Sequence, residues 1–277
     1  MEYTEVDIRL KQVYPFADLL VSKLNDIEFE SYLEYENGLK AYIQTQLLDR
    51  SAVTETISEI SELTEISFTI KKLKQENWNV KWERNYHPVI INDSCVIRAP
   101  FHDSVVDIKY EIIIMPRMSF GTGHHETTKL MIAEMFNLDL NGKSVLDMGS
   151  GTGVLAILAS KLGASNLVGI DYDDWAFNNA KDNAILNNVS NIQFLYGNSD
   201  SIGDKKYDII LANINRNIIL NDIEIYFGAM NLGGEILLSG FFKEDVSLIL
   251  KKIKKLRLKL IVRKNKNRWQ MIHLKKV

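Results

Sequence analysis

This sequence has almost no cysteine. It also has neither a long apolar run nor a start like that of a signal peptide. Cys95 is the only cysteine in 277 residues, so no internal disulfide can form, which suits a reducing compartment. No run of about 18 apolar residues occurs, which argues against a membrane-spanning helix. The first residues, MEYTEVDIRLKQ, have neither the basic start nor the apolar centre of a signal peptide. We expect a cytoplasmic protein in which Cys95 is a buried hydrophobe and not a nucleophile.

The charge of the chain is distributed unevenly. The formal net charge is only -3, and the composition of 46% hydrophobic and 25% charged residues is typical of a globular protein. Residues 1–72 nevertheless hold 14 acids and 7 bases, whereas residues 243–277 hold 13 bases and 2 acids. Such opposed ends favour a charged macromolecular partner, although ordinary solvated faces would give the same counts.

Residues 1–72 carry strand and helix patterns in the order β-α-β-β-α-β. A strand-like alternation begins at Val6, helical spacing begins at Phe16, and Asn37-Gly38 is typical of a tight hairpin turn. This order predicts a small ferredoxin-like α+β domain. The segment has no cluster of catalytic residue types, so we expect it to bind and not to react.

The remaining chain is predicted to form a linker, residues 73–103, and a second domain, residues 104–277. Trp78 and Trp82 lie four residues apart in the linker, so one helical face could carry both, docking the linker or lining a substrate path. Strand and helix patterns alternate after residue 104, which predicts a doubly wound, Rossmann-like α/β domain with a mostly parallel sheet. The chain ends in a predicted strand pair, which leaves room for seven strands.

A glycine-rich turn joins a strand to a helix in VLDMGSGTGVLAI, which runs from residue 145 to 157. Gly149, Gly151 and Gly153 permit a tight turn and a close approach of backbone to ligand, at the sheet edge where α/β proteins bind ligands. A phosphate-binding Walker loop is excluded by its spacing. A loose dinucleotide pattern through Gly151, Gly153 and Ala156 leaves NAD open.

Two acidic residues flank this turn. Asp147 precedes the first glycine, where it could organise the loop or contact the ligand's amino group through water. Asp171 ends the next predicted strand, where its carboxylate could accept hydrogen bonds from both ribose hydroxyls. Acidic surroundings suit a cationic cofactor without phosphates, which favours S-adenosylmethionine.

Three further strings carry a resemblance to a known family. VLDMGSGTGVLAI and VGIDYDDWAFNNAKDNA resemble the first two motifs of class I, seven-stranded S-adenosylmethionine-dependent methyltransferases. YDIILANI, with Asn213 after the fourth strand, resembles the asparagine motif of enzymes that methylate nitrogen. With MSFGTGHHETTKL, and a ferredoxin-like domain ahead, the chain is similar to the PrmA family, whose members methylate protein eleven of the large ribosomal subunit.

The resemblance implies an activity and a site. The activity is transfer of methyl groups from S-adenosylmethionine to lysine side chains and the N-terminal amine of a large-subunit ribosomal protein, which requires no direct nucleic-acid binding and no membrane. Thr128 would contact the cofactor, Phe120 would help form the methyl-transfer pocket, and Asn213 would accept a hydrogen bond from the amine. Asn198 stands where many class I enzymes place an acid near the adenine. Helix capping by Thr128, or a polar strand end at Asn213, would be a purely structural alternative.

A metal site is a poor interpretation of FGTGHHETT, residues 120–128. His124 and His125 are neighbours whose side chains point apart on regular structure, and no zinc-binding spacing follows. A loop that bends over a ligand at its two glycines fits better. Competing functions are a methyltransferase acting on another protein or a small-molecule amine, a nicotinamide-dependent oxidoreductase and a non-catalytic ribosome-binding module.

Overall fold

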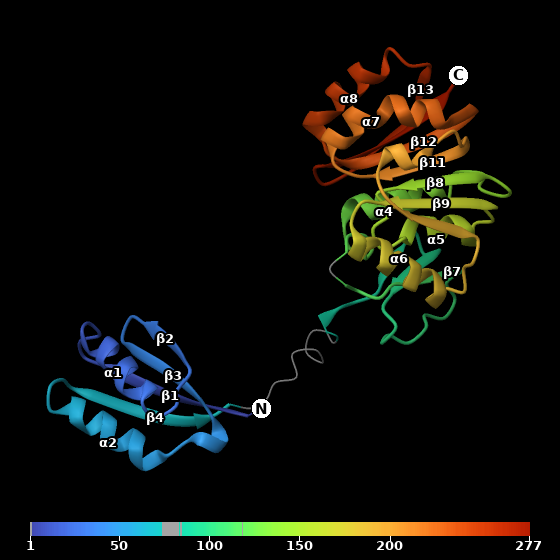
Figure 1. Ribbon diagram of the computed structural model, residues 1–277. Helices are drawn as coiled ribbons and strands as arrows, with labels where there is room; N and C mark the ends of the chain where they lie inside the picture. The colour runs from blue at the N-terminus through green and yellow to red at the C-terminus, as the bar shows by residue number, and fades with distance from the viewer. Residues whose placement is uncertain (1, 74–82, 84, 118) are drawn as a thin grey trace. The chain divides into compact units, whose positions relative to one another are not determined.

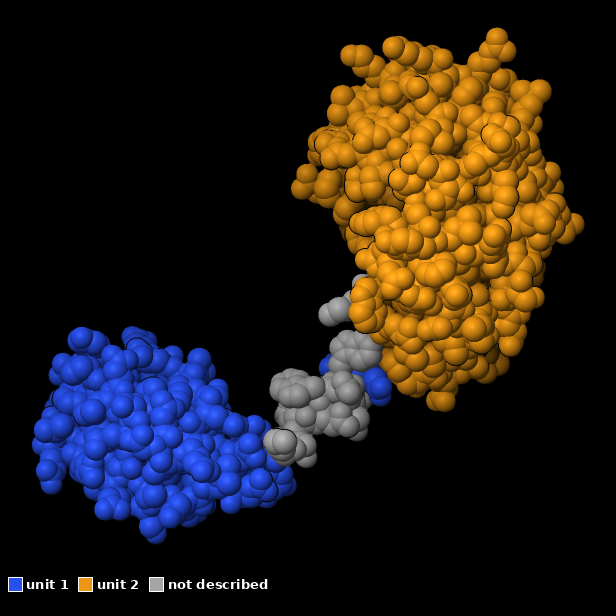
Figure 2. Space-filling view, viewed as in Figure 1, with its two compact units in different colours: residues 1–85 blue, residues 86–277 orange. Residues whose placement is uncertain are grey.

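The computed structural model describes residues 2–73, 83, 85–117 and 119–277. The chain divides into two compact units, residues 1–85 and residues 86–277, which Figure 2 colours separately. This division falls inside the range predicted as a linker. Trp78 and Trp82 lie outside the described residues.

The first unit is a four-stranded antiparallel sheet covered by two helices. Its elements follow in the predicted order and are β1 (Tyr3–Leu10), α1 (Phe16–Asn25), β2 (Ser31–Tyr35), β3 (Gly38–Gln44), the short η1 (Thr45–Leu47), α2 (Arg50–Ser61) and β4 (Ile66–Lys72). The strand order in the sheet is β2-β3-β1-β4, so β1 lies between β3 and β4. Leu20 of α1 and Ile57 of α2 pack with Val6 and Ile8 of β1 in a core of this unit's own.

The second unit is built on a seven-stranded mixed sheet (Figure 1). Its strand order is β10-β9-β8-β11-β12-β14-β13. The strands are β8 (Ser144–Met148), β9 (Asn166–Asp171), β10 (Ile192–Tyr196), β11 (Tyr207–Asn213), β12 (Met230–Phe242), β13 (Leu258–Lys266) and β14 (Trp269–Lys276). The first five are parallel, and β14 runs antiparallel to both β12 and β13. In this order β13 is the last strand, and it therefore forms one edge of the sheet.

Helices cover both faces of this sheet. They are α4 (Glu126–Met135), α5 (Val154–Lys161), α6 (Asp174–Leu186), α7 (Arg216–Ala229) and α8 (Val246–Ile253), with short η2 (Ser199–Ile202) and η3 (Lys243–Asp245). Residues of α4 and α5 share one core with the sheet, and residues of α7 and α8 share the other. None of the helices that the structure describes combines the length and apolarity needed to cross a membrane.

A small three-stranded sheet precedes the large one. It consists of β5 (Val89–Ile91), β6 (Cys95–Arg98) and β7 (Tyr110–Ile113). The first two of these strands lie inside the range 73–103 predicted as a linker, yet their apolar side chains pack in the α4–α5 core. Burial of Val89, Ile91 and Ile97 in this core removes their apolar surface from water, which stabilises the packing. Cys95 is fully buried there, as predicted, and burial raises the pKa of its thiol to about 12.

Candidate active site

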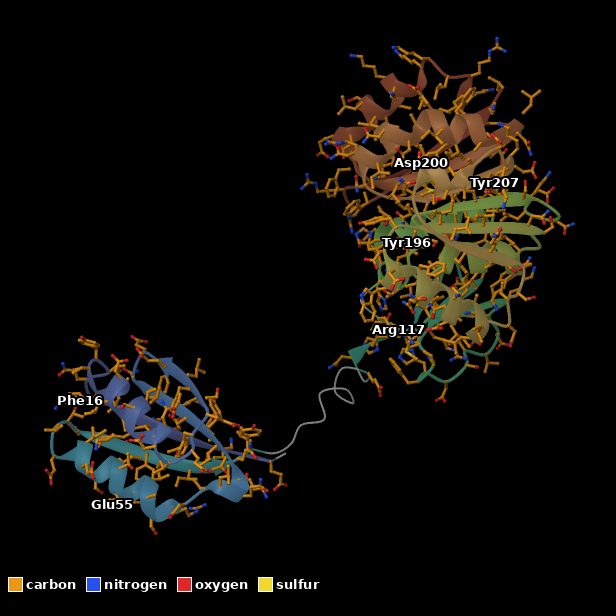
Figure 3. All side chains as sticks on the ribbon, viewed as in Figure 1. Phe16, Glu55, Arg117, Tyr196, Asp200 and Tyr207 are labelled. Atoms are coloured by element: carbon orange, nitrogen blue, oxygen red, sulfur yellow. The ribbon has the colours of Figure 1, made fainter. Side chains whose placement is uncertain are left out.

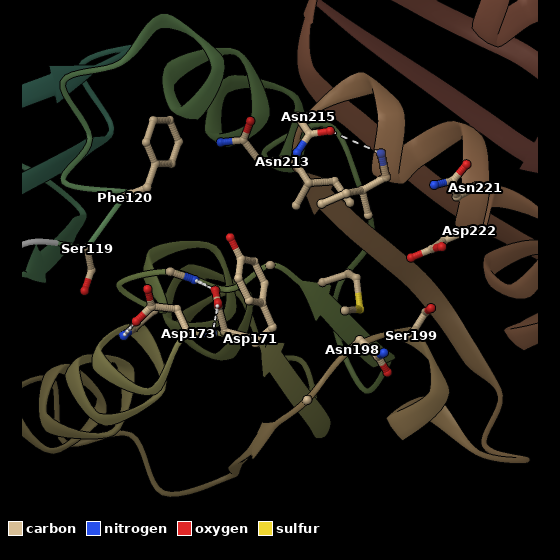
Figure 4. A pocket seen from close by; sticks show the side chains of 18 residues that line it. Ser119, Phe120, Asp171, Asp173, Asn198, Ser199, Asn213, Asn215, Asn221 and Asp222 are labelled. Carbon is tan, nitrogen blue, oxygen red and sulfur yellow. Dashed lines mark hydrogen bonds between the residues drawn. The ribbon is translucent and has the colours of Figure 1, made fainter.

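A cavity of about 460 Å³ opens at the carboxyl ends of β8, β9 and β11. This is the edge at which parallel α/β sheets bind ligands, because the loops that follow adjacent strands diverge there. Figure 4 shows Phe120 and Asn213 on one side of the cavity and Asp171 and Asn198 on the other. With Gly149 and Gly151, which also line the cavity, the structure brings together six of the residues that the sequence singles out.

The glycine turn forms the floor of this cavity through Gly149 and Gly151. Both have a left-handed backbone, with φ of +69° and +56°. A Cβ on Gly151 would lie 2.3 Å from the Phe120 carbonyl oxygen, and one on Gly149 would lie 2.2 Å from a methyl of Ile214. Only glycine therefore fits at either position. Gly153 does not line the cavity; it packs against Ala180 of α6.

Asp171 joins the glycine turn to the start of α6. Its Oδ2 accepts a hydrogen bond from the Gly151 N–H at 2.7 Å, and its Oδ1 accepts one from the Asp173 N–H at 3.0 Å. The residue is 7% exposed and lines the cavity. Each carboxylate oxygen can accept a second hydrogen bond, so capacity for two ligand hydroxyls remains.

Asp147 lies beneath the turn and does not line the cavity. It is 1% exposed, and its Oδ2 accepts a hydrogen bond from the Ala156 N–H in the first turn of α5 at 3.1 Å. Its Oδ1 has no partner among the described residues. Burial raises the pKa of this carboxyl to about 7, against the effect of the Ala156 donor, and the charge of Asp171 adds to the increase. Of the two roles considered for Asp147, the geometry fits organisation of the loop.

The segment that contains FGTGHHETT is fastened to the glycine turn. The Thr152 N–H donates to the Phe120 carbonyl at 2.9 Å, and the Thr152 hydroxyl donates to the Gly121 carbonyl at 2.6 Å. Phe120 is 54% exposed and lines the cavity. Its ring lies 5.2 Å from that of His125, edge to face. The glycine turn that follows β8 therefore fixes the position of Phe120, which precedes it by about 30 residues in the sequence.

The two histidines have separate structural partners. His125 precedes α4, and its Nδ1 accepts a hydrogen bond from the Thr127 N–H at 3.3 Å, capping the helix. His124 Nε2 lies 3.0 Å from the carbonyl oxygen of His87. Thr128 is fully buried, its hydroxyl has no partner among the described residues, and it does not line the cavity. The described residues contain no group of three or more His, Cys, Asp or Glu side chains placed to hold a metal ion.

Asn213 is the last residue of β11 and lines the cavity. Its Oδ1 is buried and has no hydrogen-bond partner among the described residues. A buried carbonyl oxygen without a donor is costly, about 1–3 kcal/mol, and in a residue that lines a cavity it leaves an acceptor available for a ligand N–H or O–H. Asn198 also lines the cavity, but its Oδ1 already accepts a hydrogen bond from the Asp200 N–H at 3.0 Å, capping η2.

Several residues that line the cavity are not among those predicted from the sequence. Asn215 caps α7 by accepting a hydrogen bond from the Ile218 N–H, and a capping asparagine ahead of an apolar run could have revealed its place. Asp222, by contrast, reaches the cavity from the second turn of α7, which no local pattern indicates. Tyr172 and Asp173 follow β9 directly and could have been included with Asp171 as strand-end residues.

The cavity suits a cationic ligand that carries a ribose. Among the described residues that line it, Asp171, Asp173 and Asp222 are carboxylic acids, and none is lysine or arginine. The Ala156 N–H at the start of α5 donates its hydrogen bond to Asp147. It is therefore not available to a pyrophosphate, which binds to free N–H groups at a helix N-terminus. The residues present therefore fit S-adenosylmethionine better than a dinucleotide.

Comparison with known proteins gives a consistent result. The model of the family described as ribosomal protein L11 methyltransferase (PrmA) matches residues 17–277. The ribosomal protein L11 methyltransferase of Phocaeicola vulgatus is 44% identical over 276 residues, which cover 98% of each chain. That of Bacteroides thetaiotaomicron is 43% identical over 92% of each chain. A crystal structure of ribosomal protein L11 methylase from Lactobacillus delbrueckii subsp. bulgaricus has a TM-score of 0.65 at 26% identity, covering 69% of this chain and 100% of that one.

Proposed function

Because the chain belongs to the ribosomal protein L11 methyltransferase family, we propose that it transfers methyl groups from S-adenosylmethionine to amines of protein L11 in the large ribosomal subunit. The acceptors are lysine side chains and the N-terminal amine. The second unit is the class I methyltransferase domain with its seven-stranded Rossmann-like sheet. The first is a ferredoxin-like domain that recognises the substrate protein, in keeping with its β-α-β-β-α-β order and central β1.

The residues of the cavity take separate parts in this proposal. S-adenosylmethionine, when bound, supplies a methyl group that its sulfonium centre already activates. Gly149 and Gly151 let the backbone approach the ligand closely, and Asp171 accepts hydrogen bonds from ribose hydroxyls. Asn198 lies by the adenine end, and Phe120 forms a wall of the transfer pocket. Thr128 and Gly153, which do not line the cavity, support the site from behind.

Asn213 orients the acceptor. Its Oδ1 accepts an N–H from the amine, which directs the nitrogen lone pair away from the strand end and towards the methyl group. Because positioning of two reactants accounts for much of catalysis in such a transfer, removal of this hydrogen bond should slow the reaction more than it weakens binding. The observation that carries the proposal is that Asn213 lines the cavity at the end of β11 and has a side-chain oxygen that is buried without a hydrogen-bond partner among the described residues.

The test is methylation of purified L11 by wild type and by Asn213→Ala, with a radiolabelled methyl donor. We expect the rate of the variant to fall by about 10²-fold, while its dissociation constant for S-adenosylmethionine, measured by calorimetry, changes by less than about threefold. Asn221→Ala, which alters an amide elsewhere in the lining, is the matched control. Wild-type turnover in Asn213→Ala would contradict the role of Asn213, and no methylation of L11 by the wild type would contradict the substrate.

A further inference from the structure

Acidic and basic residues are distributed unevenly along the sequence of the second unit. Residues 104–242 hold 16 acids and 9 bases, whereas residues 243–277 hold 2 acids and 13 bases. The basic segment forms η3, α8, β13 and β14, at the end of the sheet where β13 is the edge strand. The methyl-transfer reaction uses none of these charges, so they call for a separate explanation.

Most of these bases are exposed and have no acidic partner. Four of the thirteen form ion pairs with acids, for example Lys252 with Glu224 and Lys264 with Glu134. Eight others are exposed and have no ion pair within the described part of the chain: Lys243, Lys251, Lys254, Lys255, Arg257, Lys259, Arg263 and Lys266. We call these eight residues the C-terminal basic surface. Figure 3 shows nitrogen-tipped side chains projecting outward from this end of the unit.

The surface is elongated and ends near the active site. β13 has nine residues, and at about 3.3 Å per residue it extends for roughly 30 Å. Lys259 lies near its start and Lys266 at its end. Immediately after β13, the Asn267 side chain donates a hydrogen bond to Glu126 at the start of α4, the helix that follows the FGTGHH segment. The line of charge therefore leads towards the mouth of the cavity.

The chemistry of the surface narrows the choice of partner. A ribosomal protein substrate is itself basic as a rule, so like charges would oppose its docking here. A membrane would require a continuous apolar face to insert, but the apolar face of α8, with Val246, Ile249 and Ile253, is buried in the core. Three exposed apolar residues of the segment, Leu248, Leu260 and Ile261, lie among charged side chains in the sequence. A sugar-phosphate backbone presents a row of negative charges that suits an elongated row of flexible bases.

We propose that the C-terminal basic surface binds the phosphate backbone of RNA. The choice of RNA among polyanions rests on the proposed function. The surface has no exposed aromatic side chain along β13 on which bases could stack, so the contact is electrostatic and independent of base sequence. Its affinity must then fall steeply with salt.

The experiment measures binding of the full-length protein to a fluorescein-labelled RNA hairpin of about 30 nucleotides by anisotropy, at several KCl concentrations and without methyl donor. The test variant carries Lys254→Gln, Lys255→Gln, Lys259→Gln and Arg263→Gln. The control variant carries four neutralisations of exposed lysines elsewhere: Lys11→Gln, Lys71→Gln, Lys109→Gln and Lys205→Gln. Both variants change the net charge equally, and circular dichroism checks that each is folded.

We expect the wild type and the control to bind with similar affinity and salt slope. The test variant should bind at least about tenfold more weakly, and its log-log salt slope should be smaller by about one for each phosphate that is no longer neutralised. Equal weakening of both variants, or no RNA binding at about 50 mM KCl, would overturn the proposal. So would stronger competition by poly-glutamate than by unlabelled RNA, since that would identify an acidic protein as the partner. RNA binding is measured without methyl transfer. The binding result therefore stands whether or not the protein methylates L11, and the two proposals can fail separately.

Discussion

At the scale of single residues, Asp171 links the cofactor site to the glycine turn. Its two oxygens hold the N–H groups of Gly151 and Asp173 while the carboxylate faces the cavity. One side chain therefore shapes the turn and faces the ligand site. This double role explains why a strand-end carboxylate, which the sequence pattern assigns to the ribose alone, is largely buried.

We predict that Asp171→Ala weakens S-adenosylmethionine binding by about ten- to a hundredfold, because a charge-assisted contact contributes roughly 1.5–3 kcal/mol. Asp171→Asn keeps one acceptor oxygen and should lose less. Isothermal calorimetry measures both, with Asp204→Ala, on an exposed turn, as control. Unchanged affinity in Asp171→Ala would show that the ribose is held elsewhere.

The buried carboxyl of Asp147 should make stability depend on pH. Its folded-state pKa is about 7, above the ordinary value of 3.8, so between these limits the folded protein binds a proton that the unfolded chain releases. Stability from this group is present below pH 3.8 and is lost as the pH rises through 7, by up to about 4 kcal/mol. Asp147→Asn cannot titrate.

We therefore predict that Asp147→Asn gains stability relative to wild type when the pH is raised from about 5 to about 8. Urea unfolding of the ligand-free proteins at both pH values measures this difference, and Asp204→Asn controls for the loss of an exposed charge. A difference between wild type and Asp147→Asn that does not vary with pH would refute the raised pKa. An overall offset at every pH reflects the packing of the new amide and bears on nothing else.

At the scale of elements, α4 connects the mouth of the cavity to the far strands of the sheet. Its Glu134 is 2% exposed and pairs with Lys264 of β13 at 2.6 Å and with His273 of β14 at 3.0 Å. Burial alone would raise the pKa of Glu134, but the hydrogen bonds from Lys264, His273 and Asn137 hold it below its ordinary value of 4.5. The helix that begins beside Phe120 is thus anchored on the hairpin at the edge of the sheet.

We predict that Glu134→Gln lowers the free energy of unfolding at neutral pH by on the order of 1–2 kcal/mol. Its buried carboxylate loses charge-assisted hydrogen bonds from Lys264 and His273, whereas Lys264 itself is 38% exposed and stays solvated. The folded pKa is depressed, so this stability is present above pH 4.5 and is lost as the pH falls below it. Denaturant unfolding at about pH 7 and about pH 4 should show the two proteins converging on acidification. Glu224→Gln, which breaks the more exposed pair with Lys252, should have a much smaller effect.

At the scale of the whole molecule, the two units differ in charge and in content. The first has its own core and sheet, and residues 1–72 carry the excess of acid. The second contains every residue that lines the cavity. Recognition of a basic substrate and methyl transfer can therefore reside in different parts of the chain, with a tether that raises the local concentration of acceptor.

We predict that a chain truncated to residues 86–277 binds S-adenosylmethionine nearly as tightly as the full protein but no longer methylates L11. Both quantities should be measured on one preparation whose circular dichroism shows it to be folded. In the full protein, raising KCl should slow methylation at low substrate concentration, because complementary charge is screened. Full activity of the truncated chain would exclude the first unit as the recognition element, and loss of cofactor binding would mean that the units fold cooperatively.

Local sequence determined the features that depend on neighbours along the chain. The β-α-β-β-α-β order of the first unit, the strand–turn–helix around Gly149 and Gly151, and the strand-end places of Asp171 and Asn213 all follow from periodicity and backbone freedom. These features are local because a strand pattern, a left-handed glycine or a strand end is specified by a few consecutive residues.

Only the tertiary structure decided which of these residues face the ligand and which support it. Burial of Thr128, packing of Gly153 on Ala180 and the reach of Asp222 into the cavity each depend on segments distant in sequence. The same holds for β5 and β6, which lie where a linker is predicted but have a core to join. A single side chain's surroundings are set by which elements pack together, and that packing is a property of the whole fold.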